Sequence, residues 1–330
     1  MAFLAFPVTI NVYVNVNQIS RPSTARHPHD ALPRHPMSLP SDDALPFPPA
    51  ALQVGARGPW QAWQLTPERL ARQPVSLSAL DPAAKPLSLG SKARDQAAVE
   101  AIADELDGLQ NLLFVDRRFK LLLVLQGTDT SGKDGTVRGV FSRTSPLGVH
   151  TVGWQAPTQV EKDRDFLWRI HQRVPGAGEI TVFNRSHYED VLVPVVNGWV
   201  SPEQTRQRLA QINDFERMLA QNGTVILKCL LHIGKDEQRE RLQARIDDPA
   251  KHWKFSLGDV EARQQWDDYQ RAYDQLLNAT STPWAPWTVI PANSKTHRNL
   301  MVGSLVRDTL QRLGLRYPPE NPALKGLRIS

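Results

Sequence analysis

The sequence predicts an α/β fold in which helices cover both faces of a parallel β-sheet. Helical patterns alternate along the chain with short apolar runs, and this alternation favours parallel pairing of the strands. Polar side chains that follow such strands would share one edge of the sheet, where ligands bind in open α/β folds. Four β-branched or apolar runs are typical of buried strands, at 121–125, 179–183, 224–232 and 287–291.

The predicted helices follow from apolar spacing and from signals at their ends. Apolar residues recur at helical spacing from Val99 to Leu113, before the first strand. Ser201-Pro-Glu-Gln204 is a capping box with proline at the first helical position. That helix is expected to stop at Asn222-Gly223, a good C-cap pair, and a final helix passes through Leu300.

A glycine-rich loop, Gly127-Thr-Asp-Thr-Ser-Gly-Lys-Asp-Gly135, follows the first strand and precedes a predicted helix. A strand, a glycine loop that ends in lysine, and a helix form the context of a phosphate-binding P-loop. The glycines let successive N–H groups face one point, and Lys133 would place a positive charge on a phosphoryl group. The phosphate-binding residues predicted from this loop are Gly127, Thr130, Ser131, Gly132, Asp134 and Gly135.

Two acids distinguish this loop from an ordinary nucleotide-triphosphatase loop. Asp134 occupies the position after Lys133 where a Ser or Thr hydroxyl would hold Mg²⁺. Asp129 lies inside the loop, where an acid is explained if it binds Mg²⁺ that in turn binds phosphate. The alternative is a glycine loop with two solvated acids, which the flanking strand and helix disfavour.

A second polar cluster, Asn184-Arg-Ser-His-Tyr-Glu-Asp190, follows the strand at 179–183. So many polar groups at the end of a buried strand indicate a ligand site. The Arg185 guanidinium could grip a phosphate bidentately, or it could form a salt bridge to Asp190 that only shapes the turn. A lone histidine in a polar turn is more often a hydrogen-bonding partner, so His187 is given no chemical role.

Together the two motifs closely resemble those of the second polyphosphate kinase family. The resemblance runs from about Lys92 to about Leu313. It implies a thymidylate-kinase-like P-loop fold that transfers phosphoryl groups between polyphosphate and nucleotides. It also implies Mg²⁺ as the metal, with Mn²⁺ as an alternative, held by Asp129 and Asp190. The catalytic residues implied are Asp129, Lys133, Arg185 and Asp190.

The segment 239–273 resembles the helical lid of that family. Basic residues in it would contact the polyphosphate chain, and the candidates are Arg245, Lys251 and Lys254. Asn184 and Tyr188 are expected either to contact substrate or to support the side chains that do. For Arg241, an ordinary solvated helix surface is as good an interpretation as a functional role.

Composition agrees with a polyanionic partner. The 330 residues carry a formal net charge of +5, and 41% of them are hydrophobic, enough for a sizeable core. The sequence pI is about 9.4. Cys229 is the single cysteine, so no intrachain disulfide can form. There is no apolar run of 18 residues and no basic run with interleaved aromatics, so we expect neither a membrane span nor nucleic-acid binding.

We expect a cytoplasmic homo-oligomer, a dimer or a tetramer, whose substrates are inorganic polyphosphate with AMP or ADP, and with GMP or GDP as further acceptors. Residues 1–55 are interpreted as a proline-rich, disordered extension, because nine of the 26 prolines lie in the first fifty positions. Residues 56–330 form the predicted phosphotransferase domain. Met37 is the expected natural start.

Substrate choice and reaction class leave alternatives. The wording of the motifs resembles short family members that use both AMP and ADP, but Val191–Val196 lacks an arginine that similar members carry. An ATP-dependent nucleotide or nucleoside kinase of the same fold is a second reading, which Asp134 disfavours. A polyphosphate or nucleic-acid binder without activity is a third, which the complete set of candidate catalytic residues disfavours.

Overall fold

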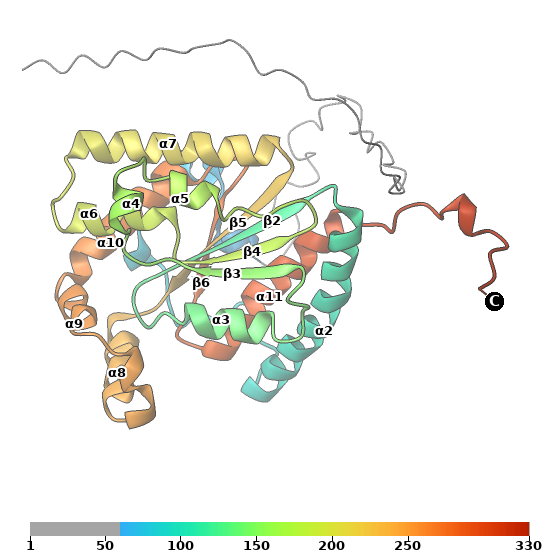
Figure 1. The fold of residues 1–330 in the computed structure, drawn as a ribbon. Helices are drawn as coiled ribbons and strands as arrows, with labels where there is room; N and C mark the ends of the chain where they lie inside the picture. The colour runs from blue at the N-terminus through green and yellow to red at the C-terminus, as the bar shows by residue number, and fades with distance from the viewer. Residues whose placement is uncertain (1–59, 330) are drawn as a thin grey trace, which may run out of the picture. The chain divides into compact units, whose positions relative to one another are not determined.

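A computed structural model describes residues 60–329, so the predicted extension at 1–55 and the expected start at Met37 lie outside the described residues. The described part contains a six-stranded sheet in the order β1-β6-β5-β2-β4-β3 (Figure 1). The strands are β1 (Gln64–Leu65), β2 (Lys120–Gln126), β3 (Val149–Gly153), β4 (Ile180–Asn184), β5 (Thr224–His232) and β6 (Trp287–Pro291).

The α/β prediction is confirmed, and β2 to β6 pair in parallel. Two edge strands were not predicted. The two-residue β1 pairs antiparallel with β6, and it is too short to show a pattern. β3 is partly or fully exposed along its length, so its residues lack the apolar run by which the buried strands were recognised.

The helices lie between the strands along the chain. The capping box at Ser201 is present, with both of its reciprocal hydrogen bonds, at the start of the long helix that follows the strand-end cluster. The helices are α1 (Pro67–Arg72), α2 (Lys92–Asp116), α3 (Lys133–Val140), α4 (Gln159–Lys162), α5 (Trp168–His171), α6 (Val193–Val196), α7 (Pro202–Gln221), α8 (Lys235–Ile246), α9 (Leu257–Gln264), α10 (Trp266–Thr280) and α11 (Lys295–Arg312). Short 3₁₀ helices are η2 (Gln61–Trp63), η3 (Leu77–Ala79), η4 (His187–Val191), η5 (Pro249–Lys254) and η6 (Pro322–Leu324).

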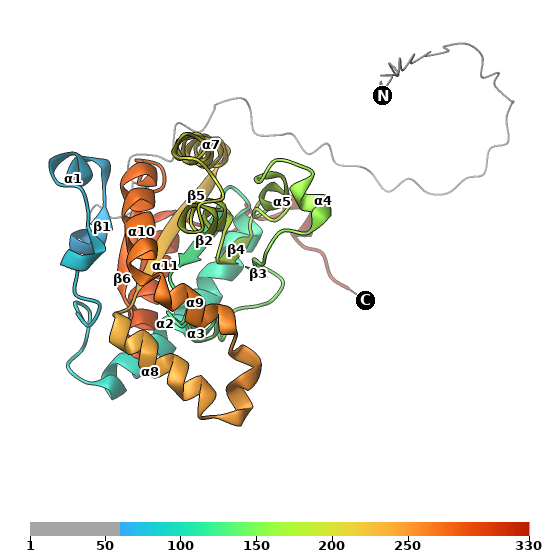
Figure 2. The ribbon, with the colours of Figure 1, turned by 90° about the vertical axis from the view of Figure 1, so that its left-hand side faces the viewer.

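Each face of the sheet has its own apolar core. Because side chains alternate across a strand, Leu121 and Leu123 pack with α2, α3 and α11, whereas Leu122 and Val124 pack with α7 and α10. Figures 1 and 2 show these two helical layers on opposite sides of the strands. In residues 60–329, no helix is both long enough and apolar enough to cross a membrane.

The sheet order places the two polar motifs side by side. β2 lies between β4 and β5, so the glycine loop (residues 127–135) after β2 adjoins the turn after β4. Leu125 pairs with Asn184, and the Arg185 N–H donates to the Leu125 carbonyl at 3.0 Å. The parallel pairing therefore brings the residues of both motifs to one edge of the sheet.

Candidate active site

The glycine loop uses backbone conformations that only glycine adopts easily. Gly127 has φ +146° and Gly132 has φ +100°. A Cβ at Gly127 would lie 2.6 Å from the Leu231 carbonyl oxygen, and one at Gly132 would overlap the Arg298 guanidinium. The loop can therefore pack this closely against β5 and α11 only with glycine at both positions.

We expect Gly132→Ala to destabilise the fold by about 2 kcal/mol or more, because it adds left-handed strain and displaces a buried arginine. Urea denaturation would measure this change. Gly108→Ala in α2 is the matched control, since a Cβ there meets nothing within 4 Å and helical alanine is favoured over glycine. A Gly132→Ala variant as stable as that control would contradict the packing described here.

Lys133 is the first residue of α3, and its side chain folds back over the loop. Its ammonium group donates to the carbonyl of Gly127 at 2.6 Å and to that of Thr128 at 3.3 Å. Burial, and then the nearby Arg185 charge, lower the pKa of Lys133 from its ordinary value. The lysine is thus a buried cation aimed at the loop, in a position suited to a phosphate group.

Two buried arginines hold the loop carbonyls from behind. Arg241 of α8 donates to the carbonyls of Thr130 (2.9 Å) and Ser131 (3.2 Å), and it also donates to two carbonyls that follow β6. Arg298 of α11 donates to the Ser131 carbonyl at 3.2 Å. The Arg241 side chain is only 9% exposed, so its interpretation as solvated helix surface is wrong. Nothing in the local sequence distinguishes it from a surface arginine.

Arg185 begins the turn after β4 in a left-handed conformation, with φ +64°. Its guanidinium donates to the Asp129 carboxylate at 2.8 Å. The alternative salt bridge to Asp190 is therefore not the one that forms. Burial lowers the pKa of Arg185, but Glu189 and Asp129 outweigh it and the net pKa is raised. A second contact joins the two motifs, because the Asn184 amide donates to the Asp134 carboxylate at 2.7 Å.

The two acids at the end of the strand-end motif face different surroundings. Asp190 pairs with Arg169 at 3.3 Å, and it lines neither of the cavities described below. Glu189 lines the narrower cavity together with Asp129 and Arg185. Burial raises the pKa of both acids, although Arg185 opposes the shift at Glu189 and Arg169 opposes it at Asp190. Glu189 thus occupies the place beside Asp129 that was expected for Asp190.

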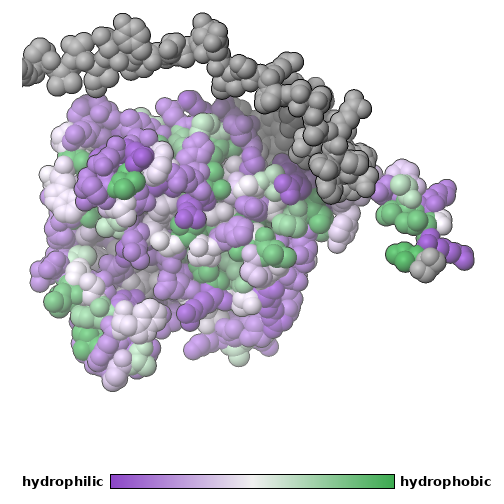
Figure 3. All heavy atoms as spheres, viewed as in Figure 1, coloured by the Kyte–Doolittle hydropathy of each residue, from purple (hydrophilic) through white to green (hydrophobic). Residues whose placement is uncertain are grey.

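Two cavities meet at Asp129 and Arg185, which line both of them. The wide cavity, of about 430 Å³, is lined mainly by polar residues of the glycine loop, β3, β4, α8, η5 and α9. The narrow cavity, of about 80 Å³, has an aromatic wall. In Figure 3, a notch separates the projection that contains α8 from the surface over α3.

Most of the predicted site residues line these cavities. Those in the wide cavity are Asp129, Thr130, Gly132, Lys133, Asp134, Gly135, Asn184, Arg185, Arg245 and Lys254. Gly127 lines the narrow one.

Four predicted site residues lie elsewhere. Ser131 is buried, with its N–H bonded to the Thr128 carbonyl, and Tyr188 is fully buried under the turn. Lys251 pairs with Asp248 on an exposed surface, and Asp190 turns to Arg169. From its buried position Tyr188 cannot contact substrate, so of its two expected roles only the support of neighbouring side chains remains.

The narrow cavity was not anticipated, and neither was its aromatic wall. Trp266, Tyr269 and Tyr273 of α10 line it. Trp266 also joins the apolar core. The spacings of three and four residues place all three rings on one helix face, and this signal is visible in the sequence.

The segment resembling a lid consists of α8, η5, α9 and the start of α10, which lie together in Figure 2. Arg241 ties α8 to the glycine loop, and Tyr273 of α10 belongs to the core. No residue of η5 or α9 is buried. The part of the lid that could open with little loss of packing is therefore 249–264.

Comparison with known proteins identifies the chain's relatives. The family model described as "Polyphosphate kinase 2 (PPK2)" matches residues 89–315. The chain belongs to the polyphosphate kinase 2 family. A protein of Meiothermus ruber named AMP/ADP-polyphosphate phosphotransferase is 50% identical over 234 residues, which are 70% of this chain and 88% of that protein. A Rhodopseudomonas palustris protein named ADP-polyphosphate phosphotransferase is 40% identical over 67% of this chain and 80% of that protein.

A solved structure agrees with this membership. The polyphosphate kinase 2 from Arthrobacter aurescens TC1 has a TM-score of 0.77 and 42% sequence identity, covering 82% of this chain and 95% of that one. The resemblance inferred from the two motifs is therefore confirmed. The family match covers both motifs and the whole of α10. The residues that line the two cavities therefore lie in the part of the chain that the family shares.

Proposed function

We propose that this chain is a phosphotransferase that moves the terminal phosphoryl group of inorganic polyphosphate to AMP and ADP. The names of the relatives support this substrate class. The observation that carries the proposal is that two adjoining cavities share Asp129 and Arg185. A donor in one cavity and an acceptor in the other would meet where these two side chains lie.

The wide cavity suits the polyphosphate chain. It combines loop N–H groups, Lys133 and the basic residues Arg245 and Lys254, which together favour a flexible polyanion. The narrow cavity is the proposed nucleotide site, because the rings of Tyr269 and Tyr273 provide a stacking surface for a flat base. At about 80 Å³ it must widen to admit a nucleotide. Lys251 is an exposed residue of η5, and we retain it as a contact for polymer that extends beyond the cavity.

A Mg²⁺ ion at this site would have Asp129 as its main protein ligand. Among residues 60–329 no group of three or more His, Cys, Asp or Glu side chains is arranged to hold a metal ion. Mg²⁺ typically needs only one or two carboxylates when substrate phosphates and waters complete its shell. Asp129 would hold the ion, and Mn²⁺ is the expected substitute. Glu189 is a better candidate than Asp190 for a second ligand, because it lines the same cavity as Asp129. The ion would neutralise phosphate charge and align the two substrates.

The protein side chains then supply position and charge. Lys133 would hold the terminal phosphoryl group against the loop, and Arg185 would leave Asp129 to bind the oxygens in transfer. The acceptor is a phosphate oxygen that is already ionised at pH 7, so no strong base is required. Segment 249–264 would exclude water and so prevent loss of the phosphoryl group to hydrolysis.

We also propose GMP and GDP as acceptors and a homo-oligomeric state. The aromatic wall stacks on any purine, since every base has a π-face. Dimers or tetramers are what the family resemblance implies, and the mass of the particle in solution would test this.

Purified protein with long-chain polyphosphate, Mg²⁺ and each of AMP, ADP, GMP and GDP in turn tests the function, with products resolved by chromatography. AMP should yield ADP and then ATP, and chelation of the metal should stop turnover until Mg²⁺ or Mn²⁺ is restored. Use of ADP alone would restrict the acceptor class. Transfer from ATP, with none from polyphosphate, would replace the proposal by an ATP-dependent kinase.

A further inference from the structure

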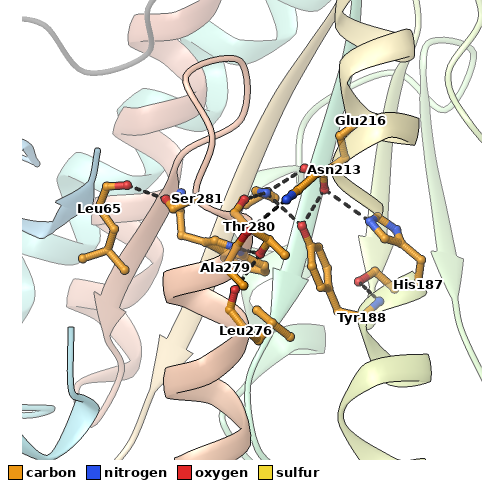
Figure 4. Close-up of polar contacts among 12 residues, drawn as sticks. Leu65, His187, Tyr188, Asn213, Glu216, Leu276, Ala279, Thr280 and Ser281 are labelled. Atoms are coloured by element: carbon orange, nitrogen blue, oxygen red, sulfur yellow. Dashed lines mark hydrogen bonds and ion pairs between the residues drawn. The ribbon is translucent and has the colours of Figure 1, made fainter. Parts of the chain in front are cut away.

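A fully buried charged cluster lies directly behind the strand-end turn (Figure 4). Lys228 of β5 is 1% exposed, and Glu216 of α7 is fully buried. The Lys228 ammonium donates to the Glu216 carboxylate at 2.7 Å, to the Tyr188 hydroxyl at 2.8 Å and to the Thr280 carbonyl at 2.7 Å. All three N–H groups of the ammonium therefore donate hydrogen bonds, and the three acceptors lie on three different helices.

The Glu216 carboxylate is shared in the same way. Its second oxygen accepts the Tyr188 hydroxyl proton at 2.7 Å and lies 3.2 Å from Nε2 of His187. Both of these residues belong to η4, the same short helix that carries Glu189. Burial alone would raise the pKa of Glu216, but Lys228 and His187 lower it.

Stability alone does not explain an ion pair in this place. The other residues of β5 are buried too, and most of them are apolar. Replacing a buried ion pair with apolar residues of similar volume is often neutral or stabilising, because both charges lose their hydration on folding. An apolar pair could not form the hydrogen bonds that join η4, α7, β5 and the end of α10.

Two of the elements that meet at this point, η4 and α10, also line the narrow cavity. η4 begins two residues after Arg185 and supplies Glu189, and α10 supplies Tyr269 and Tyr273. The residues of the aromatic wall belong to α10, and the carbonyl of its last residue, Thr280, accepts a hydrogen bond from Lys228. A shift of the buried cluster would therefore move the charged side and the aromatic side of the cavity relative to each other.

We propose that Glu216, Lys228 and Tyr188 are positioning residues that fix the distance between η4 and α10, and so place Arg185 and Glu189 for phosphoryl transfer. None of the three touches substrate. This inference rests on the proposed function, because the transfer reaction is what the placement serves.

Tyr188→Phe tests the inference with the smallest change. It keeps the ring, the Lys228–Glu216 pair and the His187–Glu216 contact, and it removes only the hydroxyl that bonds both Lys228 and Glu216. We expect kcat to fall by about ten- to a hundredfold, since small misplacements of reacting groups have effects of this size. The KM for polyphosphate should stay the same, because the wide cavity does not depend on the link.

Thr309→Val in α11 is the matched control. It also removes a buried hydroxyl, but that hydroxyl bonds the Leu305 carbonyl of its own helix and belongs to a helix outside the cluster. We expect its kcat to stay within twofold of the wild type. A purely structural role of the cluster would instead lower the melting temperature of Tyr188→Phe and leave its kcat unchanged at temperatures well below melting.

A double variant, Glu216→Leu with Lys228→Met, separates stability from placement. We expect a melting temperature equal to or above that of the wild type, together with a loss of kcat as large as that of Tyr188→Phe. If either Tyr188→Phe or the folded double variant keeps wild-type kcat, the inference is wrong, and Tyr188→Phe decides alone should the double variant not fold. Wild-type protein inactive with polyphosphate would refute the proposed function instead, so the two failures are distinct.

Discussion

Lys133→Met should lower kcat/KM with polyphosphate by about a thousandfold, the size of effect seen when a cation that stabilises a transferring phosphoryl group is removed. The lysine is buried, with its ammonium against the loop carbonyls of Gly127 and Thr128. The other lysine that lines one of these cavities is Lys254, which belongs to η5 and not to the glycine loop. No neighbouring ammonium of the described residues can replace it.

The same substitution should leave the fold intact or make it slightly more stable. Burial lowers the pKa of Lys133, so the folded state carries its charge at a cost that methionine would not have. Thermal melting measured beside steady-state kinetics would show this trade-off, with Lys162→Met on the exposed surface of α4 as the control. A Lys133→Met variant that kept a tenth of the wild-type kcat/KM would show that the loop binds no transferring phosphate.

The sheet was predictable because its central strands are buried on both faces. β5 and β6 have the predicted bounds, and the bounds of β2 and β4 differ from the predicted ones by one residue at each end. A continuous apolar run leaves few other interpretations for a segment of that length. β1 and β3 escaped prediction because edge strands are short or exposed, and their pairing depends on contacts with residues far along the chain.

The site was predictable where local sequence alone sets the geometry. The glycine loop is such a case, because positive φ angles and the helix start fix the direction of its groups. Arg241 and the aromatic wall of α10 lie more than a hundred residues from the loop, and only the tertiary fold brings them to it. The choice between Glu189 and Asp190 depends on a 3₁₀ turn, in which successive side chains point about 120° apart.

Glu189→Gln should lower kcat by about a hundredfold, whereas Asp190→Asn should lower it by less than about tenfold. Glu189 lines the narrow cavity with Asp129 and Arg185, so its charge would act on the arginine and on the proposed metal ion. Asp190 acts only through Arg169, which it contacts at 3.3 Å. Steady-state kinetics at saturating Mg²⁺ would rank the two. The reverse order would restore Asp190 as the metal ligand that the sequence suggested.

Stability against pH gives an independent check on Glu189. Burial raises its pKa in the folded state, so folding binds a proton more tightly than the unfolded chain does. That contribution to stability is present in full below the ordinary glutamate pKa, and it is lost as the pH rises through the folded-state value. Glutamine does not titrate, so Glu189→Gln should melt close to the wild type near pH 4 and above it near pH 7. If the variant and the wild type had equal melting temperatures at both pH values, burial would not disfavour the charged form of Glu189. Because burial disfavours the charged form of Glu189, ionising this carboxylate costs stability, as expected of a group that serves the reaction.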